Sequence, residues 1–241
     1  MKNKFDFVAR PFRLRTGFFY VFFAVAIPQF AHAQPPNWDV NIFRSINNSR
    51  SNFLDAAVGA NDYDVLPIAI GTPIIFGGLG LLEKDGYTFD TGVMVGVSEV
   101  SAYMVYYVLK DVIIKRERPY VTLSDVHTMH LDTADKYSMP SGHTTAAFAV
   151  ATALTLRYPK PYVYIPAYAW AAFVGYGRIY MGLHYPSDVL AGAILGSASA
   201  FAIHIISPQL TKLRKEILGS DLGLQLSASP LPAFVNLRVS F

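Results

Sequence analysis

Five long apolar segments constrain what this chain can fold into more than any other feature. They cover residues 66–82, 89–109, 144–156, 162–181 and 189–206. A membrane-spanning helix needs about 20 predominantly apolar residues, so several segments reach or almost reach the required length. Only 15% of the residues are charged, against about 25% in soluble domains. We therefore expect an all-α integral membrane bundle of about five transmembrane helices, although hydropathy alone also fits a buried soluble bundle.

The first 33 residues have the pattern of a secretory signal peptide. Lysines and arginines precede an apolar run at 17–27, and Ala31-His32-Ala33 forms a small-x-small cleavage site. The run of about 11 residues is short for a membrane span. We expect cleavage after residue 33; an uncleaved segment would add a sixth transmembrane helix. In both cases the chain is exported or inserted.

The rest of the chain divides into three parts. Residues 34–65 alternate apolar and polar side chains with helical spacing, which fits an interfacial amphipathic helix or a short helix that caps the bundle. Residues 66–210 form the expected helical bundle. Residues 211–241 are a less apolar tail, whose end at 234–241 alternates like a strand, and we expect this tail to be flexible.

Charge and cysteine content exclude several functions. The formal net charge is only +3, and no basic run with interleaved aromatic residues is long enough to follow a nucleic-acid backbone. The chain contains no cysteine, so disulfides, thiolate metal sites and cysteine nucleophiles are excluded together. Internal repeats are absent from the sequence.

If the mature N-terminus lies outside the cell, the connections between the five apolar segments alternate between the two sides of the membrane. The cytoplasmic side then receives Lys84, Arg157, Lys160, Lys212, Arg214 and Lys215, as the positive-inside rule requires. The outer side receives Lys110, Arg116, Arg118, His143, Arg178, His184 and Asp188. Polar groups from three separate regions therefore meet at one face, and we expect the functional site at the outer membrane–water interface.

His184 is the best candidate nucleophile of this group. Asp188 follows it by four residues, about one helical turn, and so can accept a hydrogen bond from imidazole Nδ1–H. That bond leaves Nε2 unprotonated and able to attack phosphorus. A capping aspartate beside an interfacial histidine is the alternative interpretation.

The string Pro140-Ser141-Gly142-His143 predicts an anion site at the beginning of the third apolar segment. Backbone N–H groups in the first turn of a helix have no partner within the helix and bind anions. Gly142 lets a phosphate approach the backbone, Ser141 can donate its hydroxyl, and His143 is the candidate general acid. Lys110, Arg118 and Arg178 add cations, and the two arginines can bind phosphate through two hydrogen bonds each.

These residues resemble the motifs of the type 2 phosphatidic acid phosphatase superfamily, which includes membrane lipid phosphatases, soluble bacterial acid phosphatases and vanadium haloperoxidases. The resemblance covers about residues 109–196. It implies a helical bundle that hydrolyses phosphate esters without a metal or another cofactor. It also implies that His184 forms a phosphohistidine, that Asp188 orients it and that His143 is the acid and base. The phosphate ligands would be Lys110, Arg118, Ser141, Gly142 and Arg178.

The chain departs from the family pattern at two positions. Seven residues separate Lys110 from Arg118, where the family usually has six. One extra residue turns a helix by about 100°, so Lys110 reaches the phosphate only through a π-bulge or a shifted helix end, or is replaced by Lys115 or Arg116. The serine that commonly precedes the last arginine is Gly177 here.

Other histidines have simpler interpretations. His127 and His130, with Asp125 and Asp132, lie in the segment 120–139 but match no strong metal-binding spacing. We expect this segment to be a solvated loop that shapes substrate entry. His204, on the fifth apolar segment, is expected to be packed in the core.

The function expected from the sequence is that of a lipid-phosphate phosphatase in a bacterial cell membrane, multi-pass, with its site facing the periplasm or the outside. Candidate substrates are phosphatidic acid, phosphatidylglycerol phosphate, polyprenyl diphosphate and lipid A phosphate. The alternatives are a secreted soluble acid phosphatase, a lipid phosphotransferase, a vanadate-dependent halide oxidase and a scaffold without turnover. The expected partners are the substrate and membrane lipids; the sequence leaves the oligomeric state unknown.

Overall fold

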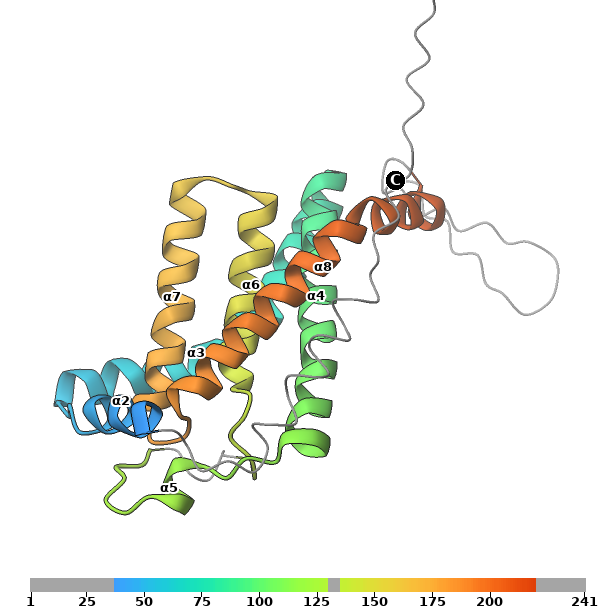
Figure 1. Cartoon of the computed structure of the whole chain (residues 1–241). Helices are drawn as coiled ribbons and strands as arrows, with labels where there is room; N and C mark the ends of the chain where they lie inside the picture. Colours follow the sequence, from blue (N-terminus) through green and yellow to red (C-terminus); the bar gives the residue numbers. More distant parts are fainter. Residues whose placement is uncertain (1–36, 130–134, 220–241) are drawn as a thin grey trace, which may run out of the picture.

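The computed structural model describes residues 37–129 and 135–219 (Figure 1). Helices make up all of the regular structure in these residues: α2 (Asn37–Asn47), α3 (Asn52–Leu82), α4 (Gly86–Tyr107), the π-helix η2 (Val108–Ile114), α5 (Pro119–Thr122), α6 (Gly142–Arg157), α7 (Pro161–Tyr180) and α8 (Pro186–Leu218). The all-α prediction is therefore confirmed for the described part. The predicted signal peptide, His130, Asp132 and the terminal 220–241 lie outside the described residues.

Three of the described stretches are long and apolar enough to cross a membrane: α3, Gly86–Thr122, which contains α4, and α8. The remaining two bundle helices, α6 and α7, have 16 and 20 residues. At 1.5 Å per residue α6 is about 24 Å long, which is shorter than the ~30 Å hydrocarbon core of a bilayer. Three helices therefore meet the length and composition of a membrane span, and the presence of five spans stays a prediction.

Helix α6 is the centre of the bundle and packs against α4, α7 and α8. Its side chains Ala147, Ala149, Ala151 and Ala153 are completely buried. Small residues let α8 approach closely, because a Cβ added at Gly192 would lie 2.6 Å from the Ser141 carbonyl oxygen. Close backbone contact through small residues is typical of helix packing in membranes.

Two expected boundaries fall inside helices. Helix α3 begins at Asn52, where Ser51 caps it by accepting a hydrogen bond from Leu54 N–H at 3.2 Å, and it continues across residue 65. The described part of the segment 34–65 is therefore α2, a short connection and the first part of α3. Helix α8 likewise continues across residue 210 to Leu218.

Helix α2 caps one end of the bundle, which is one of the two interpretations given above. It packs on α7 and α8, with Asp39, Phe43 and Asn47 buried. Trp38 and Ile42 on the same helix are about half exposed.

The π-helix η2 continues α4 at the point where the sequence has one residue more than the family pattern. Lys115 N–H donates to the Lys110 carbonyl at 3.1 Å, a bond five residues apart in place of the usual four. Lys115 then adopts the left-handed conformation with φ of 50° and ends the helix. The wide turn absorbs the extra residue, as the sequence analysis required for Lys110 to face the site.

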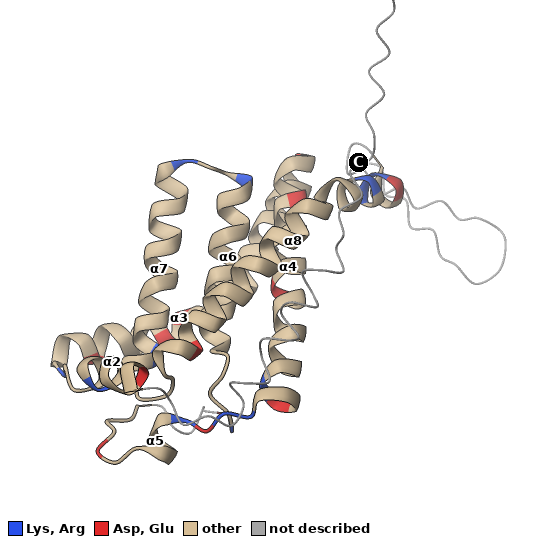
Figure 2. Ribbon diagram, viewed as in Figure 1, with Lys and Arg blue, Asp and Glu red and all other residues tan. Residues whose placement is uncertain are grey.

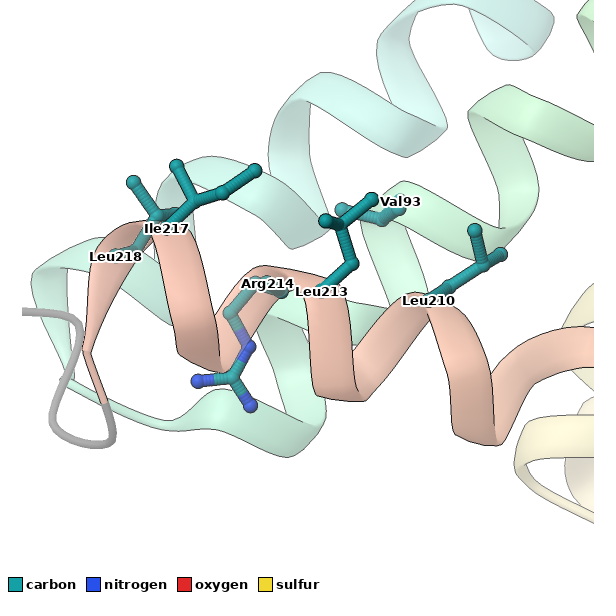
Figure 3. Close-up of a pocket in the computed structure, with 6 residues that line it drawn as sticks. All are labelled: Val93, Leu210, Leu213, Arg214, Ile217 and Leu218. Atoms are coloured by element: carbon teal, nitrogen blue, oxygen red, sulfur yellow. The ribbon is translucent and has the colours of Figure 1, made fainter.

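Charged side chains gather at the two ends of the bundle, and the middle of α6 and α7 is free of them (Figure 2). One end carries α2, α5 and the start of α8; the other carries the α3–α4 and α6–α7 connections and the end of α8 (Figure 1). At this second end Arg214 donates to Asp90 from α4 at 3.1 Å. A shallow apolar pocket lies beside it, and Arg214 points away from Leu213 and Ile217 (Figure 3).

Candidate active site

The predicted site residues come together at the first end of the bundle from three chain regions. Lys110 and Arg118 come from η2 and the segment that follows, and Ser141 to His143 come from the start of α6. Arg178 is in the last turn of α7, His184 in the turn between α7 and α8, and Asp188 in the first turn of α8. Six of the eight side chains are buried: Lys110, Arg118, Ser141, Arg178, His184 and Asp188. His143 keeps 33% of its side chain exposed, so the site opens to solvent at this residue.

His184 presents an unprotonated Nε2 to the centre of the site. Arg118 Nη1 lies 3.2 Å from Nε2, and because a guanidinium can only donate, Nε2 must be the acceptor. The ring proton of neutral His184 is therefore on Nδ1. Burial, followed by the charges of Arg118, Lys110 and Arg178, lowers the pKa of His184 well below 6.5. The ring is neutral at neutral pH, which is the state that a nitrogen nucleophile requires.

Asp188 lies behind His184, but the expected hydrogen bond is not formed. The distance from His184 Nδ1 to Asp188 Oδ2 is 3.7 Å, longer than a hydrogen bond, and Nδ1 has no other partner among the described residues. The carboxylate instead accepts from Tyr185 N–H at 2.8 Å and from Arg116 Nη1 at 2.7 Å. The Asp188 carboxylate thus lies next to the His184 ring, about 1 Å too far from Nδ1 for a hydrogen bond.

Asp62 from α3 joins the site and was missed by the sequence analysis. It forms an ion pair with Arg178 Nη1 and lies 3.6 Å from His143 Nε2. Its side chain is 9% exposed. An acidic residue on a helix apolar enough to span a membrane is the signal that could have identified it.

Asp135 was also missed, and it occupies the space between two predicted phosphate ligands. Lys110 Nζ lies 2.7 Å from Asp135 Oδ2, Arg118 Nη2 pairs with Oδ1, and the Tyr106 hydroxyl donates to Oδ2 at 2.8 Å. Burial alone would raise the pKa of Asp135, but the hydrogen bonds and charges of these neighbours lower it to about 2. The neighbouring cations and hydroxyl thus stabilise a negative charge at this position.

The start of α6 is fixed by contacts with both neighbouring motifs. Ser141 N–H donates to the Asp188 carbonyl at 3.0 Å, and the Ser141 hydroxyl lies 2.9 Å from that of Thr144. A Cβ at Gly142 would lie 3.0 Å from the Tyr106 ring. A larger residue at position 142 would therefore need the Tyr106 ring to shift.

Gly177 lies close to a neighbouring helix. A Cβ at this position would lie 3.2 Å from Val58 Cγ1 of α3, so a larger residue would require the Val58 side chain to shift by a few tenths of an ångström.

The described residues contain no group of three side chains suited to a metal ion. His127 is held by its backbone instead, because its N–H and carbonyl both bond to the Asn47 side chain, at 2.9 and 2.7 Å. Lys115 and Arg116, the suggested substitutes for Lys110, point to other roles: Lys115 ends η2, and Arg116 pairs with Asp39 and Asp188.

Comparison with known proteins matches this arrangement to one family. The model of the PAP2 superfamily matches residues 91–212, just over half of the chain, and includes every predicted site residue. The chain belongs to the PAP2 superfamily. Together with the apolar helices, this membership identifies it as a membrane protein of a family of phosphatases.

Individual relatives share the same core. The chain is 33% identical over 110 residues to an undecaprenyl-diphosphatase of Sulfolobus acidocaldarius, covering 44% of this chain and 52% of that protein. It is 46% identical over 114 residues to a lipid A 1-phosphatase of Porphyromonas gingivalis, covering 43% of this chain and 26% of that protein. The chain thus matches about half or less of the length of these relatives.

A solved structure extends the likeness to most of the fold. The transmembrane PAP2-type phosphatidylglycerolphosphate phosphatase of Bacillus subtilis superposes with a TM-score of 0.63 at 25% identity. The superposition covers 80% of this chain and 94% of that one. The helical arrangement, and not only the motif region, is therefore shared.

Proposed function

We propose that the chain hydrolyses phosphate esters or diphosphates of membrane lipids through a phosphohistidine formed on His184. The observation that carries this proposal is the environment of Nε2, which Arg118 holds unprotonated at 3.2 Å beside buried Lys110 and Arg178. A neutral imidazole among cations suits attack on a dianionic phosphate.

The reaction would proceed in two displacements. In the first, His184 Nε2 bonds to phosphorus while the bond to the lipid oxygen breaks, and protonated His143 gives its proton to that oxygen. In the second, His143 takes a proton from water, the water oxygen bonds to phosphorus, and the P–N bond breaks to release phosphate and neutral His184. His143 then holds the proton needed for the next turnover.

The cations would act on the non-bridging oxygens during both steps. Lys110, Arg118 and Arg178 can neutralise the transferring group, and the first-turn N–H groups of α6 at Gly142 can add donors. The substrate phosphate would displace the Asp135 carboxylate, which now occupies Lys110 and Arg118. Asp188 would stabilise the positive charge that the His184 ring acquires.

A lipid substrate fits the position of the site. It lies at the ends of α4 and α8, two of the stretches able to cross a membrane, and so at the depth of lipid head groups. Relatives named as an undecaprenyl-diphosphatase and a lipid A 1-phosphatase support this class. We propose that five spans place the site on the periplasmic side, because the opposite end carries Lys84, Arg157 and Lys160.

The test is phosphate release by detergent-purified protein from a panel of phosphatidic acid, phosphatidylglycerol phosphate, a polyprenyl diphosphate and lipid A, with EDTA present. We expect release that survives EDTA and is abolished in His184→Ala. Activity retained in this variant would overturn the nucleophile assignment, and loss with EDTA would overturn the metal-free mechanism. The panel ranks the substrates.

Two alternatives are separated by the same assay. A secreted soluble acid phosphatase would purify without detergent and prefer water-soluble esters. A phosphotransferase would move phosphate to an added lipid acceptor instead of to water, since both reactions can share the phosphohistidine.

A further inference from the structure

A buried cluster of charges behind the site is not explained by the proposed chemistry. Asp39 is completely buried on α2, and the Arg116 side chain is 10% exposed. Arg116 Nη1 lies 2.7 Å from Asp188 Oδ1, and Nη2 lies 2.8 Å from Asp39 Oδ2. One guanidinium therefore joins two carboxylates from helices that are almost 150 residues apart in the sequence.

Asp39 also holds the beginning of α8. Ser187 donates its N–H to Asp39 Oδ1 at 2.9 Å and its hydroxyl to Oδ2 at 2.6 Å. A carboxylate at a helix N-terminus satisfies unpaired N–H groups and interacts favourably with the helix dipole. The rings of Phe43 and Tyr185, 5.7 Å apart, and Arg116, 4.1 Å from the Tyr185 ring, fix the same turn.

The charges of this cluster leave one negative charge behind His184. If Arg116 paired with Asp188 alone, the two charges would cancel, and Asp188 would have little attraction for an imidazolium. Asp39 shares the guanidinium, so the cluster of Asp39, Arg116 and Asp188 has a net charge of −1. The largest effects of charge on His184 come from Arg118, Lys110 and Arg178, which lower its pKa, and from Asp135, which raises it.

We propose that Asp39, acting through Arg116, is a positioning residue that keeps the charge of Asp188 available to His184. The charge is needed when Nε2 bonds to phosphorus and the ring becomes positive. This inference rests on the proposed function for its catalytic meaning, but the charge coupling itself is a property of the folded chain.

Changing the cluster charge in both directions tests the coupling. Asp39→Asn makes the cluster neutral, Arg116→Gln makes it −2, and the double variant restores −1. A negative charge nearby favours the protonated ring, so the pKa of His184 should be lower than wild type in Asp39→Asn and higher in Arg116→Gln, by about one unit each. The double variant should return close to wild type.

The pKa is measured by NMR of histidine-labelled protein in detergent, with His184→Asn used to assign the signal among the six histidines. Two controls remove contacts without changing this charge. Ser187→Ala removes the hydroxyl bonds to Asp39 and Arg116, and Asp90→Asn removes a buried carboxylate of the Arg214 pair at the far end. Both variants should leave the pKa of His184 unchanged.

Activity adds a second readout. Asp39→Asn should lower kcat roughly tenfold with KM nearly unchanged, because the charge is used after the substrate has bound. Opposite shifts with recovery in the double variant support the inference. Equal titration of His184 in all folded variants, or shifts of the same sign in both single variants, would overturn it. If the wild type releases no phosphate but the opposite shifts are seen, the proposed function fails and the charge coupling stands.

Discussion

At the scale of single residues, each of the three cations proposed to bind phosphate already has a carboxylate partner. Asp135 pairs with Lys110 and Arg118, and Asp62 pairs with Arg178. The two carboxylates therefore offset much of the repulsion among the cations without substrate, and a phosphate must compete with a carboxylate. Asp135 is 48% exposed and Asp62 only 9%, so Asp135 is the group that a substrate can displace.

Replacing Asp135 with Asn should therefore strengthen phosphate binding. We expect KM and the inhibition constant of inorganic phosphate to fall about threefold to tenfold, because phosphate no longer has to displace a carboxylate from Lys110 and Arg118. Acidification should not imitate this change above about pH 3, because the pKa of Asp135 is lowered to about 2 and the carboxylate stays charged above it. Inhibition curves at several pH values measure both effects; weaker phosphate binding in the variant would contradict the competition.

Replacing Lys110 and replacing Arg118 should lower activity by comparable factors. The structure brings both to the same Asp135 carboxylate, so the extra residue between them does not displace the lysine. Lys110→Met and Arg118→Met should each lower kcat/KM by at least about 100-fold, through loss of charge stabilisation of the transferring group. A much smaller loss for Lys110→Met would show that the lysine leaves the site when substrate binds.

At the scale of helices, η2 predicts that one residue can be removed from the chain without moving the site. Deleting Val112, which is 61% exposed, restores the six-residue spacing and should convert η2 into a regular α-helix with Lys110 still facing the site. Activity should stay within about tenfold of wild type. Deleting Val100 in regular α4 is the control, because it turns the following residues by about 100° and should abolish activity.

Close packing of α6 and α8 gives a second prediction at this scale. A Cβ at Gly196 would collide with the Thr145 carbonyl oxygen, so Gly196→Ala should lower the free energy of unfolding by about 1–3 kcal/mol. At Gly78 of α3 nothing lies within 4 Å, and Gly78→Ala should be neutral or stabilising by up to about 1 kcal/mol. Thermal unfolding in detergent compares the two variants.

The helices also show how far the sequence could predict the fold. Segments 89–109 and 162–181 became α4 with η2 and α7 because their apolar residues are continuous. The start of α3 and the end of α8 were not predicted, because Asp55, Asp62 and Arg214 interrupt the apolar runs of the sequence. The helices continue through these residues, whose charged side chains form ion pairs. The convergence of the eight site residues followed from the order of the segments. The partners Asp39 and Asp62 depend on contacts between helices that are distant in the sequence, and Asp135 depends on the position of the loop residue itself.

At the scale of the whole molecule, the arrangement of charge predicts the orientation in the membrane. Charged residues gather at the two ends of the bundle, and the middle of α6 and α7 has none (Figure 2). The far end carries Lys84, Arg157 and Lys160 at the connections between helices, in addition to the Asp90–Arg214 pair. Because cytoplasmic loops carry an excess of Lys and Arg, the site end should face outward, where a lipid phosphate of the outer leaflet would reach it.

Cysteine labelling measures this orientation directly, because the chain has no cysteine of its own. Ser124→Cys places a thiol at an exposed position between α5 and α6 at the site end, and Lys160→Cys places one at an exposed position between α6 and α7. In intact spheroplasts a membrane-impermeant maleimide should label Ser124→Cys and spare Lys160→Cys, and lysis should make both reactive. Since neither position is in the site, both variants should remain active. The reverse labelling would place the site in the cytoplasm, and labelling of both in intact cells would contradict a bundle that crosses the membrane between them.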